Sequence, residues 1–199
     1  MAENSSHRNE RLAFKIKAED FLGEGAYGQV HRILVDGGVY AVKRFRRNVQ
    51  NRTPISSYMN ELNILKRLKH RHIIKLAGSY TSPDFFGIVM SPVADCNLAT
   101  FLSTIAAAGD KGLVFSLRSF FGCLARALAY LHSKRIRHKD IKPQNILVEG
   151  NTVLLTDFGI SYDWENSARS TTSGDTVKTR RYCAPEVSQS LPRGSSSDI

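Results

Sequence analysis

Two segments carry most of the chemical information in this sequence: His138-Lys139-Asp140-Ile141-Lys142-Pro143-Gln144-Asn145 and, a short apolar stretch later, Asp157-Phe158-Gly159. Phosphoryl transfer requires an aspartate that can accept a hydroxyl proton, a lysine that can neutralise phosphoryl charge, and oxygen ligands that can hold magnesium. Asp140 and Lys142 can supply the first two groups, and the Asn145 amide with the Asp157 carboxylate can supply the third. The two segments therefore indicate phosphoryl-transfer chemistry.

A glycine-rich segment near the N-terminus, Gly23-Glu24-Gly25-Ala26-Tyr27-Gly28, fits the pattern GxGxxG. This pattern alone is a weak signal, because glycines are common in turns. Here it lies between two predicted strands rather than between a strand and a helix, so it does not fit the dinucleotide fingerprint. It fits a hairpin that covers phosphates, in which small residues let backbone amides approach an anion.

Two further positions extend the pattern between these segments. Lys43 ends a predicted strand, and Glu61 lies in the middle of a predicted helix among apolar neighbours. Each residue alone is typical of an ordinary surface position. Together they suggest an ion pair that directs the ammonium group at phosphate oxygens. Ala184-Pro185-Glu186, after a long polar loop, adds a fifth motif in the same order.

The remaining pattern predicts an α+β chain with strands first and helices later. Strands are predicted at residues 21–22, 30–35, 39–45, 73–80, 85–89, 146–148 and 153–155, and helices at 57–68, 98–107 and 117–132. Asp36-Gly37-Gly38 supplies the glycines that a tight hairpin needs. Pro54 is expected just before the first helix, and helix 117–132, apolar on most faces, is expected to be central and buried.

Composition excludes several classes of protein. The chain has 199 residues, of which 42% are hydrophobic and 23% charged, as in ordinary globular proteins. Its three scattered cysteines favour neither a disulfide framework nor a zinc site. No apolar leader or membrane span is evident, so a cytoplasmic location is expected, with a nuclear one as an alternative. The net charge of +10 lacks interleaved aromatic residues, so nucleic acid is not an expected partner.

The five ordered motifs make residues 14–199 resemble a eukaryotic protein kinase domain of the serine/threonine type. The resemblance implies a two-lobed α+β fold: an N-lobe at 14–90 with a five-stranded antiparallel sheet and one helix, a hinge at 91–94, and a mainly helical partial C-lobe at 95–199. Residues 1–13 are expected to form a flexible tail. Because the resemblance ends where the family's F helix begins, the chain is expected to be C-terminally truncated.

The resemblance also implies the catalytic and metal-binding roles. Asp140 would be the catalytic base, and Lys142 would lie beside the γ-phosphate of ATP. Lys43, paired with Glu61, would contact the α and β phosphates, and Asn145 and Asp157 would bind Mg²⁺. Thr179 matches the threonine that in serine/threonine kinases bonds the catalytic aspartate and lysine. Serine or threonine hydroxyls of proteins are therefore the expected acceptors.

ATP contacts follow from the same resemblance. Gly23, Gly25 and Gly28 would cover the nucleotide, and Met90 would be the gatekeeper. The remaining expected contacts are with the adenine, the hinge and the ribose rim, through Val30, Ala41 and Leu147, the backbone of Ser91 and Val93, and Asn97. A hydrophobic regulatory column would comprise Leu65, Leu76, His138 and Phe158.

Some positions depart from the family pattern. Lys139 stands where the family usually has arginine, and it lacks the bidentate fork that grips a phosphorylated loop. Hydroxyls at residues 170–176 nevertheless make loop phosphorylation a hypothesis. Gln144 and Asn97 replace carboxylates of arginine-directed relatives, while Lys178, Arg180 and Arg181 favour acidic or phosphorylated peptides.

Two alternatives to an active kinase stay open from the sequence. One is a truncated or pseudokinase-like fragment that binds ATP or protein partners without efficient turnover, because the family's later helices would normally cover the apolar face of helix 117–132. The other is a basic nucleic-acid-binding module. Asp198 matches a family residue that braces the backbone around His138, but fraying is expected at its terminal position. Oligomeric state is not indicated.

Overall fold

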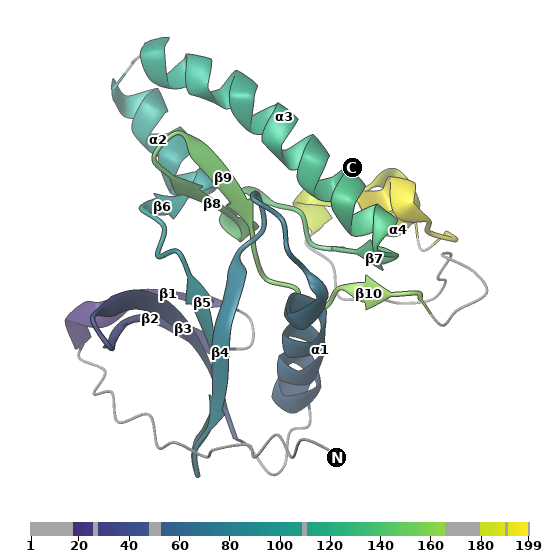
Figure 1. The fold of residues 1–199 in the computed structure, drawn as a ribbon. Coiled ribbons are helices and arrows are strands. Elements are labelled where there is room, and N and C mark those ends of the chain that lie inside the picture. Colours follow the sequence, from purple (N-terminus) through teal and green to yellow (C-terminus); the bar gives the residue numbers. More distant parts are fainter. Residues whose placement is uncertain are drawn as a thin grey trace, which may run out of the picture.

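The computed structural model describes residues 18–25, 28–47, 53–108, 111–165, 180–189 and 191–198. A five-stranded antiparallel sheet in the order β1-β2-β3-β5-β4 forms the N-lobe. Its strands are β1 (Phe21–Gly25), β2 (Gly28–Val35), β3 (Gly38–Arg46), β4 (Lys75–Thr81) and β5 (Phe85–Ser91), preceded by the short 3-10 helix η1 (Ala18–Asp20). Figure 1 shows α1 (Thr53–Arg67) beside this sheet, with the helices of the C-lobe above both. The predicted fold class is confirmed.

The β2–β3 hairpin has a two-residue turn. Asp36 and Gly37 have positive φ angles of 49° and 79°, and Val35 pairs with Gly38 across the turn. Gly38, expected in the turn, therefore belongs to β3. Left-handed backbone at both central positions matches the twist of the flanking strands, which explains why this local prediction succeeded.

Helix α1 begins four residues earlier than the apolar pattern indicated. Pro54 lies inside the first turn of the helix rather than upstream of it. In a first turn the missing proline N–H costs no hydrogen bond, because the first N–H groups of a helix have no partner within it. Leu62 and Leu65 are buried in a core that also contains Phe45 of β3 and Ile88 of β5. This packing fixes the helix against the sheet and sets the position of Glu61.

The C-lobe contains helices and short strands. Its helices are α2 (Leu98–Ala108), α3 (Lys111–Ser133), α4 (Pro185–Ser188) and the 3-10 helices η2 (Pro143–Asn145), η3 (Arg180–Tyr182) and η4 (Ser195–Asp198). Its strands are β6 (Cys96–Asn97), β7 (Ile136–Arg137), β8 (Ile146–Glu149), β9 (Thr152–Leu155) and β10 (Tyr162–Asp163), which form sheets β6-β8-β9 and β10-β7. The three two-residue strands were not predicted, because two residues are too short to show alternation.

Helix α3 is buried on one face only, contrary to the expectation of a central buried helix. Phe120, Ala127 and Leu131 are buried, whereas the neighbouring Phe121 is 75% exposed. Within the described residues, α3 packs mainly against β9 and β7. The apolar residues on its other side have no comparable contact there, so composition alone overstated its burial.

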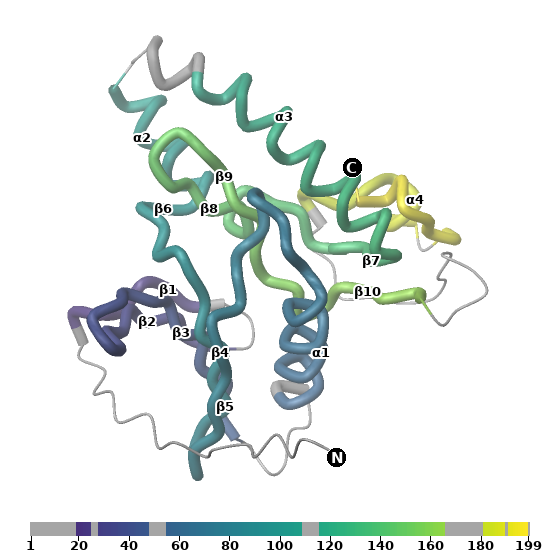
Figure 2. The backbone as a smooth tube through the Cα atoms, in the orientation of Figure 1, coloured from purple at the N-terminus to yellow at the C-terminus, as the bar shows by residue number. Residues whose placement is uncertain are grey.

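The lobes are joined by shared packing as well as by the hinge. Figure 2 traces the chain from β5 through the hinge into β6. A second connection forms where the Ile74 N–H donates to the Leu155 carbonyl at 3.0 Å and the Leu155 N–H donates to the His72 carbonyl at 2.9 Å. One hydrophobic core includes residues of both lobes. The C-lobe strands β8 and β9 and the N-lobe sheet therefore share one packed core.

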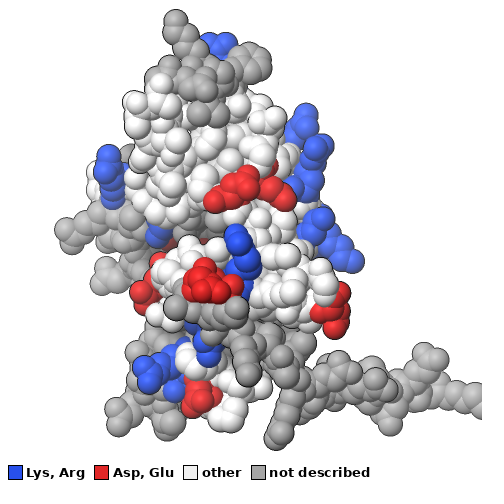
Figure 3. Space-filling view, turned by 90° about the vertical axis from the view of Figure 1, so that its left-hand side faces the viewer, with Lys and Arg blue, Asp and Glu red and all other residues white. Residues whose placement is uncertain are grey.

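The distribution of charge is mixed on the face shown in Figure 3. Basic side chains follow one edge of this face, and acidic side chains lie between basic ones over the rest of it. None of the helices formed by the described residues has the length and apolar character that membrane crossing requires.

Candidate functional site

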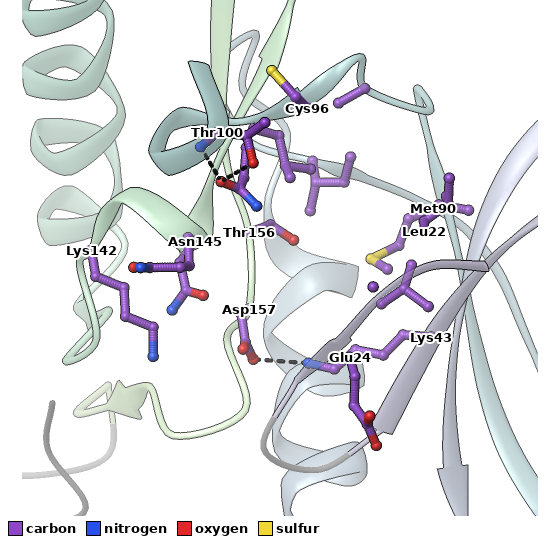
Figure 4. A pocket seen from close by; sticks show the side chains of 18 of the residues that line it. Leu22, Glu24, Lys43, Met90, Cys96, Thr100, Lys142, Asn145, Thr156 and Asp157 are labelled. Carbon is purple, nitrogen blue, oxygen red and sulfur yellow. Dashed lines mark hydrogen bonds and ion pairs between the residues drawn. The ribbon is translucent and has the colours of Figure 1, made fainter. Parts of the chain in front are cut away.

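A cavity of about 810 Å³ lies between the lobes. Both lobes line it, and most of the predicted site residues meet there: Gly23, Val30, Ala41, Lys43, Met90, Asn97, Asp140, Lys142, Asn145, Leu147 and Asp157. Figure 4 shows Lys43 and Asp157 pointing toward each other, with Lys142 and Asn145 on the opposite side of Asp157 from Lys43. The fold thus brings together residues that are far apart in the sequence.

Lys43 is the central cation of the N-lobe side. Its Nζ donates to Glu61 Oε2 at 2.7 Å and to Asp157 Oδ1 at 2.8 Å. The ion pair that the sequence suggested between Lys43 and Glu61 is therefore present, and Asp157 joins it. Lys43 lies on strand β3 and Glu61 lies on helix α1, so this ion pair directly connects α1 to the sheet.

Burial and charge act in opposite directions on these three groups. Burial alone would lower the pKa of Lys43, but Glu61 and Asp157 outweigh it and raise the pKa above its usual value. Burial, together with the nearby Asp157 charge, raises the pKa of Glu61 despite the lysine. Burial would also raise the pKa of Asp157, but Lys43 overrides it and holds the pKa below its usual range. A charged lysine beside an ionised Asp157 suits the binding of phosphates and a metal ion.

The second cluster comes from the loop around η2. Lys142 Nζ donates to Asp140 Oδ2 at 2.6 Å, and Asn145 Nδ2 donates to the same oxygen at 2.9 Å. Asn145 Nδ2 also lies 2.9 Å from the Asp140 carbonyl. The carboxylate is thus oriented by two donors that lie within five residues of it in the sequence, in a position to accept a proton from a hydroxyl group.

The backbone around these residues is held from both sides. Asp198 accepts hydrogen bonds from the N–H groups of His138 and Lys139, each at 2.7 Å. Asp198 is only 4% exposed, so the fraying expected at this position is not seen. His138 in turn contacts the Thr156 carbonyl at 2.8 Å and packs its ring against Phe158 at 5.0 Å. The loop at residues 138–145 and the loop that carries Asp157 are therefore linked directly.

The donor set fits Mg²⁺ bound together with phosphates. Asn145 uses its amide nitrogen toward Asp140, which leaves its amide oxygen available for a cation near the Asp157 carboxylate. Mg²⁺ needs only one or two protein oxygen ligands when phosphates and water complete its shell. The described part of the chain contains no cluster of three or more His, Cys, Asp or Glu side chains suited to an all-protein metal site.

Several expected contacts are not part of the cavity lining. Ser91, Val93 and Gly28 do not line it, and at the hinge Pro92 and Ala94 do. Gly25 and Gly28 instead close the β1–β2 pair, facing each other across the strands. Thr179 and residues 170–176 lie outside the described residues. Leu65, Phe158 and His138 are buried together, with Leu76 packed against the same core.

The structure also adds residues that sequence reasoning missed. Tyr182, just before Ala184-Pro185-Glu186, and Ile160, directly after Asp157-Phe158-Gly159, both line the cavity. Each residue had one usable signal, its proximity to a motif. The side-chain oxygen of Asn97 already has a partner: Oδ1 accepts a hydrogen bond from the Thr100 N–H at 3.0 Å and thereby caps the start of α2. Its side chain also lines the cavity.

Comparisons with known proteins agree with this geometry. The model of the protein kinase domain family matches residues 16–199. The chain is 34% identical to the cyclin-dependent kinase 4 homolog of Caenorhabditis elegans, over 83% of this chain and 42% of that protein. It is 33% identical to the serine/threonine-protein kinase fused of Drosophila melanogaster, over 89% of this chain and 22% of that protein. It thus spans less than half the length of these relatives.

Proposed function

Because this chain belongs to the protein kinase domain family, we propose that it transfers the γ-phosphate of ATP to serine or threonine hydroxyls of proteins. One observation carries the proposal: Lys43 of the N-lobe and Asp140 of the C-lobe line a single cavity between the lobes. Both relatives described above carry kinase in their names, and one is named a serine/threonine kinase. Lys142, two residues after Asp140, fits the same acceptor class.

In the proposed reaction, Asp140 orients the acceptor hydroxyl and takes its proton. The hydroxyl oxygen forms a bond to the γ-phosphorus while the bond to the β–γ bridging oxygen breaks, which releases ADP. The ammonium of Lys142, 2.6 Å from the Asp140 carboxylate, neutralises charge on the phosphoryl group in transfer. Lys43 holds the α and β phosphates, and Glu61 holds Lys43.

Asn145 and Asp157 are the residues that would hold the metal. Mg²⁺, when bound, supplies charge neutralisation for the phosphate oxygens. The ionised state of Asp157, stabilised by Lys43, keeps a hard oxygen ligand available at neutral pH. Val30, Ala41 and Leu147 belong to the apolar part of the cavity lining, where a planar base would fit.

Nucleotide binding tests the first half of this proposal. We expect Mg²⁺ with ATP at about 100 times its Kd to raise the melting temperature by roughly 5–10 °C. Asp157→Ala should remove most of this shift. Asp84→Ala, an exposed aspartate in the β4–β5 turn, is the matched control and should keep it. Absence of any shift in the wild-type chain would contradict the proposal.

Transfer of radiolabelled phosphate to protein substrates tests the second half. Asp140→Ala should lower the transfer rate by about 10²–10⁴-fold while the nucleotide-induced thermal shift stays, because a positioned base acts on the chemical step. Nucleotide binding with no transfer above the Asp140→Ala background would instead support the alternative, a pseudokinase-like binder.

A further inference from the structure

Asn60 makes contacts that none of the site motifs accounts for. It lies on α1 directly before Glu61 and is half-buried. Its Nδ2 donates toward three backbone carbonyls, those of Phe158 at 3.1 Å, Gly159 at 3.1 Å and Ser161 at 2.9 Å. A primary amide carries two N–H bonds, so one nitrogen here serves three acceptors. These contacts join α1 to the loop that carries Asp157.

The Asp157 loop needs such support. Asp157 has a φ of 66°, a left-handed backbone conformation. This conformation costs an aspartate about 1 kcal/mol, which contacts with its surroundings must offset. Between Phe158 and Ser161 the loop's own hydrogen bond is the Ser161 N–H to the Phe158 carbonyl, at 3.1 Å. The Asn60 amide adds bonds from outside the loop at the residues that follow the strained position.

The helix face around Asn60 fits the loop closely. A Cβ atom at Gly159 would lie 2.4 Å from the Ser57 hydroxyl oxygen, so the loop backbone lies directly against α1. Ser57, Asn60 and Glu61 share one face of the helix, at spacings of three and four residues. Arg67, two turns further, pairs with Asp163 and, at 2.7 Å, with Glu165. Asn60 therefore adds direct polar contacts between α1 and this loop, one residue before Glu61.

We propose that Asn60 is a positioning residue: its amide holds the Phe158–Ser161 backbone on α1 and thereby keeps the Asp157 carboxylate beside Lys43 and facing the cavity. The consequence for nucleotide binding rests on the proposed function, since it concerns the Mg²⁺ ligand Asp157. The consequence for the loop does not, because the hydrogen bonds exist without any ligand. The two parts can be tested separately.

The test compares three variants of the full chain. Asn60→Asp keeps the shape but replaces the donor with an acceptor facing three carbonyls, and Asn60→Gln keeps the amide. Asn63→Asp is the matched control, because Asn63 lies on the same helix and is exposed. Hydrogen exchange without nucleotide is measured at residues 158–161 and, as a control for folding, across β2 and β3.

We expect the amides of 158–161 to exchange about tenfold faster in Asn60→Asp than in the wild type, which corresponds to the loss of one to two hydrogen bonds. Asn60→Gln should restore part of the protection, and Asn63→Asp should leave it unchanged. Wild-type exchange rates at 158–161 in Asn60→Asp would overturn the proposal. Faster exchange throughout β2 and β3 in both Asn60 variants would also overturn it, because the role would then be general stability.

Nucleotide affinity separates this proposal from the proposed function. The Kd of a fluorescent ATP analogue is measured with Mg²⁺ and with EDTA. The factor by which Mg²⁺ lowers this Kd should be about tenfold smaller in Asn60→Asp than in the wild type, while the Kd in EDTA should be the same in both. An equal loss of affinity in EDTA and in Mg²⁺ would overturn the Asp157-specific role. If the wild-type chain binds no nucleotide, the proposed function fails, and the exchange measurement still decides the role of Asn60.

Discussion

His138 shows how a single buried side chain connects two loops of the site. Its Nε2 lies 2.8 Å from the Thr156 carbonyl, and its Nδ1 lies 3.3 Å from the Asp140 N–H. These partners suit the neutral ring, with the proton on Nε2 and a lone pair on Nδ1. Burial lowers the pKa of His138, against the opposing effects of Asp198, Asp157 and Asp140.

This environment predicts a stability that depends on pH. The unfolded chain binds a proton on this imidazole near pH 6.5, whereas the folded chain binds it only at lower pH. Between these values the unfolded state holds more protons, so the free energy of unfolding falls as pH falls, by up to about 1.4 kcal/mol per pH unit. Urea denaturation of the wild type at pH 7.5, 6.5 and 5.5 should show this decline.

The variant His138→Phe isolates the contribution of this ring. It should be less stable at pH 7.5 by about 1–2 kcal/mol, because the partly buried Thr156 carbonyl and Asp140 N–H lose their partner, but its stability should decline less with acid. Some decline remains, since burial also lowers the pKa of His31 and His70. An identical pH slope in variant and wild type would show that His138 does not titrate differently on folding.

At the scale of elements, the β1–β2 hairpin depends on a close approach between main chains. Gly28 begins β2, and a Cβ atom there would lie 2.3 Å from the Arg44 carbonyl oxygen of β3. A backbone oxygen in a paired strand cannot move aside as a flexible side chain can. The glycine is therefore required by packing, even though Gly28 does not line the cavity.

Replacing this glycine should disturb the hairpin. Gly28→Ala should reduce the free energy of unfolding by about 1–3 kcal/mol, the usual range for overpacking, as measured by urea denaturation. Gly78→Ala in β4 is the matched control, because nothing lies within 4 Å of its added Cβ. That variant should be neutral or stabilised by about 0.5 kcal/mol. Equal effects of the two substitutions would show that the close approach to Arg44 is relieved at no cost.

At the scale of the whole molecule, Asp198 connects a distant part of the chain to the loop that carries Asp140. Besides the N–H groups of His138 and Lys139, it contacts His132 Nε2 of α3 at 3.2 Å. A residue of η4 thus braces both α3 and the segment that leads to Asp140. Hydrogen bonds to a buried charged group are worth more than neutral ones, at about 1.5–3 kcal/mol each.

Removing the Asp198 carboxylate should lower the stability of the fold. Asp198→Ala should reduce the free energy of unfolding by about 3 kcal/mol, because two buried N–H groups lose their acceptor. Asp84→Ala, an exposed aspartate, should change it by less than about 0.5 kcal/mol. Guanidinium denaturation measures both. Similar stability of Asp198→Ala and the wild type would mean that water replaces the carboxylate without cost.

Much of the fold was predictable because its signals are local. The Asp36-Gly37 turn, the alternation of the strands beside it and the helical spacing in α1 each depend on a few consecutive residues. The boundaries of α1 were less accurate, since a proline in a first turn looks like a proline before a helix. The two-residue strands β6, β7 and β10 exist only because a partner strand lies beside them.

The sequence by itself determined which groups meet at the site: Lys43, Glu61, Asp140, Asn145 and Asp157 were identifiable because their types and order match the needs of phosphoryl transfer. Only the tertiary structure showed what surrounds them, namely the Asn60 contacts with the loop after Asp157 and the buried Asp198 carboxylate beside the backbone of His138. It also decided that α3 is buried on one face only. Chemical identity is written along the chain, whereas hydrogen bonds and burial depend on neighbours that folding brings from far away in the sequence.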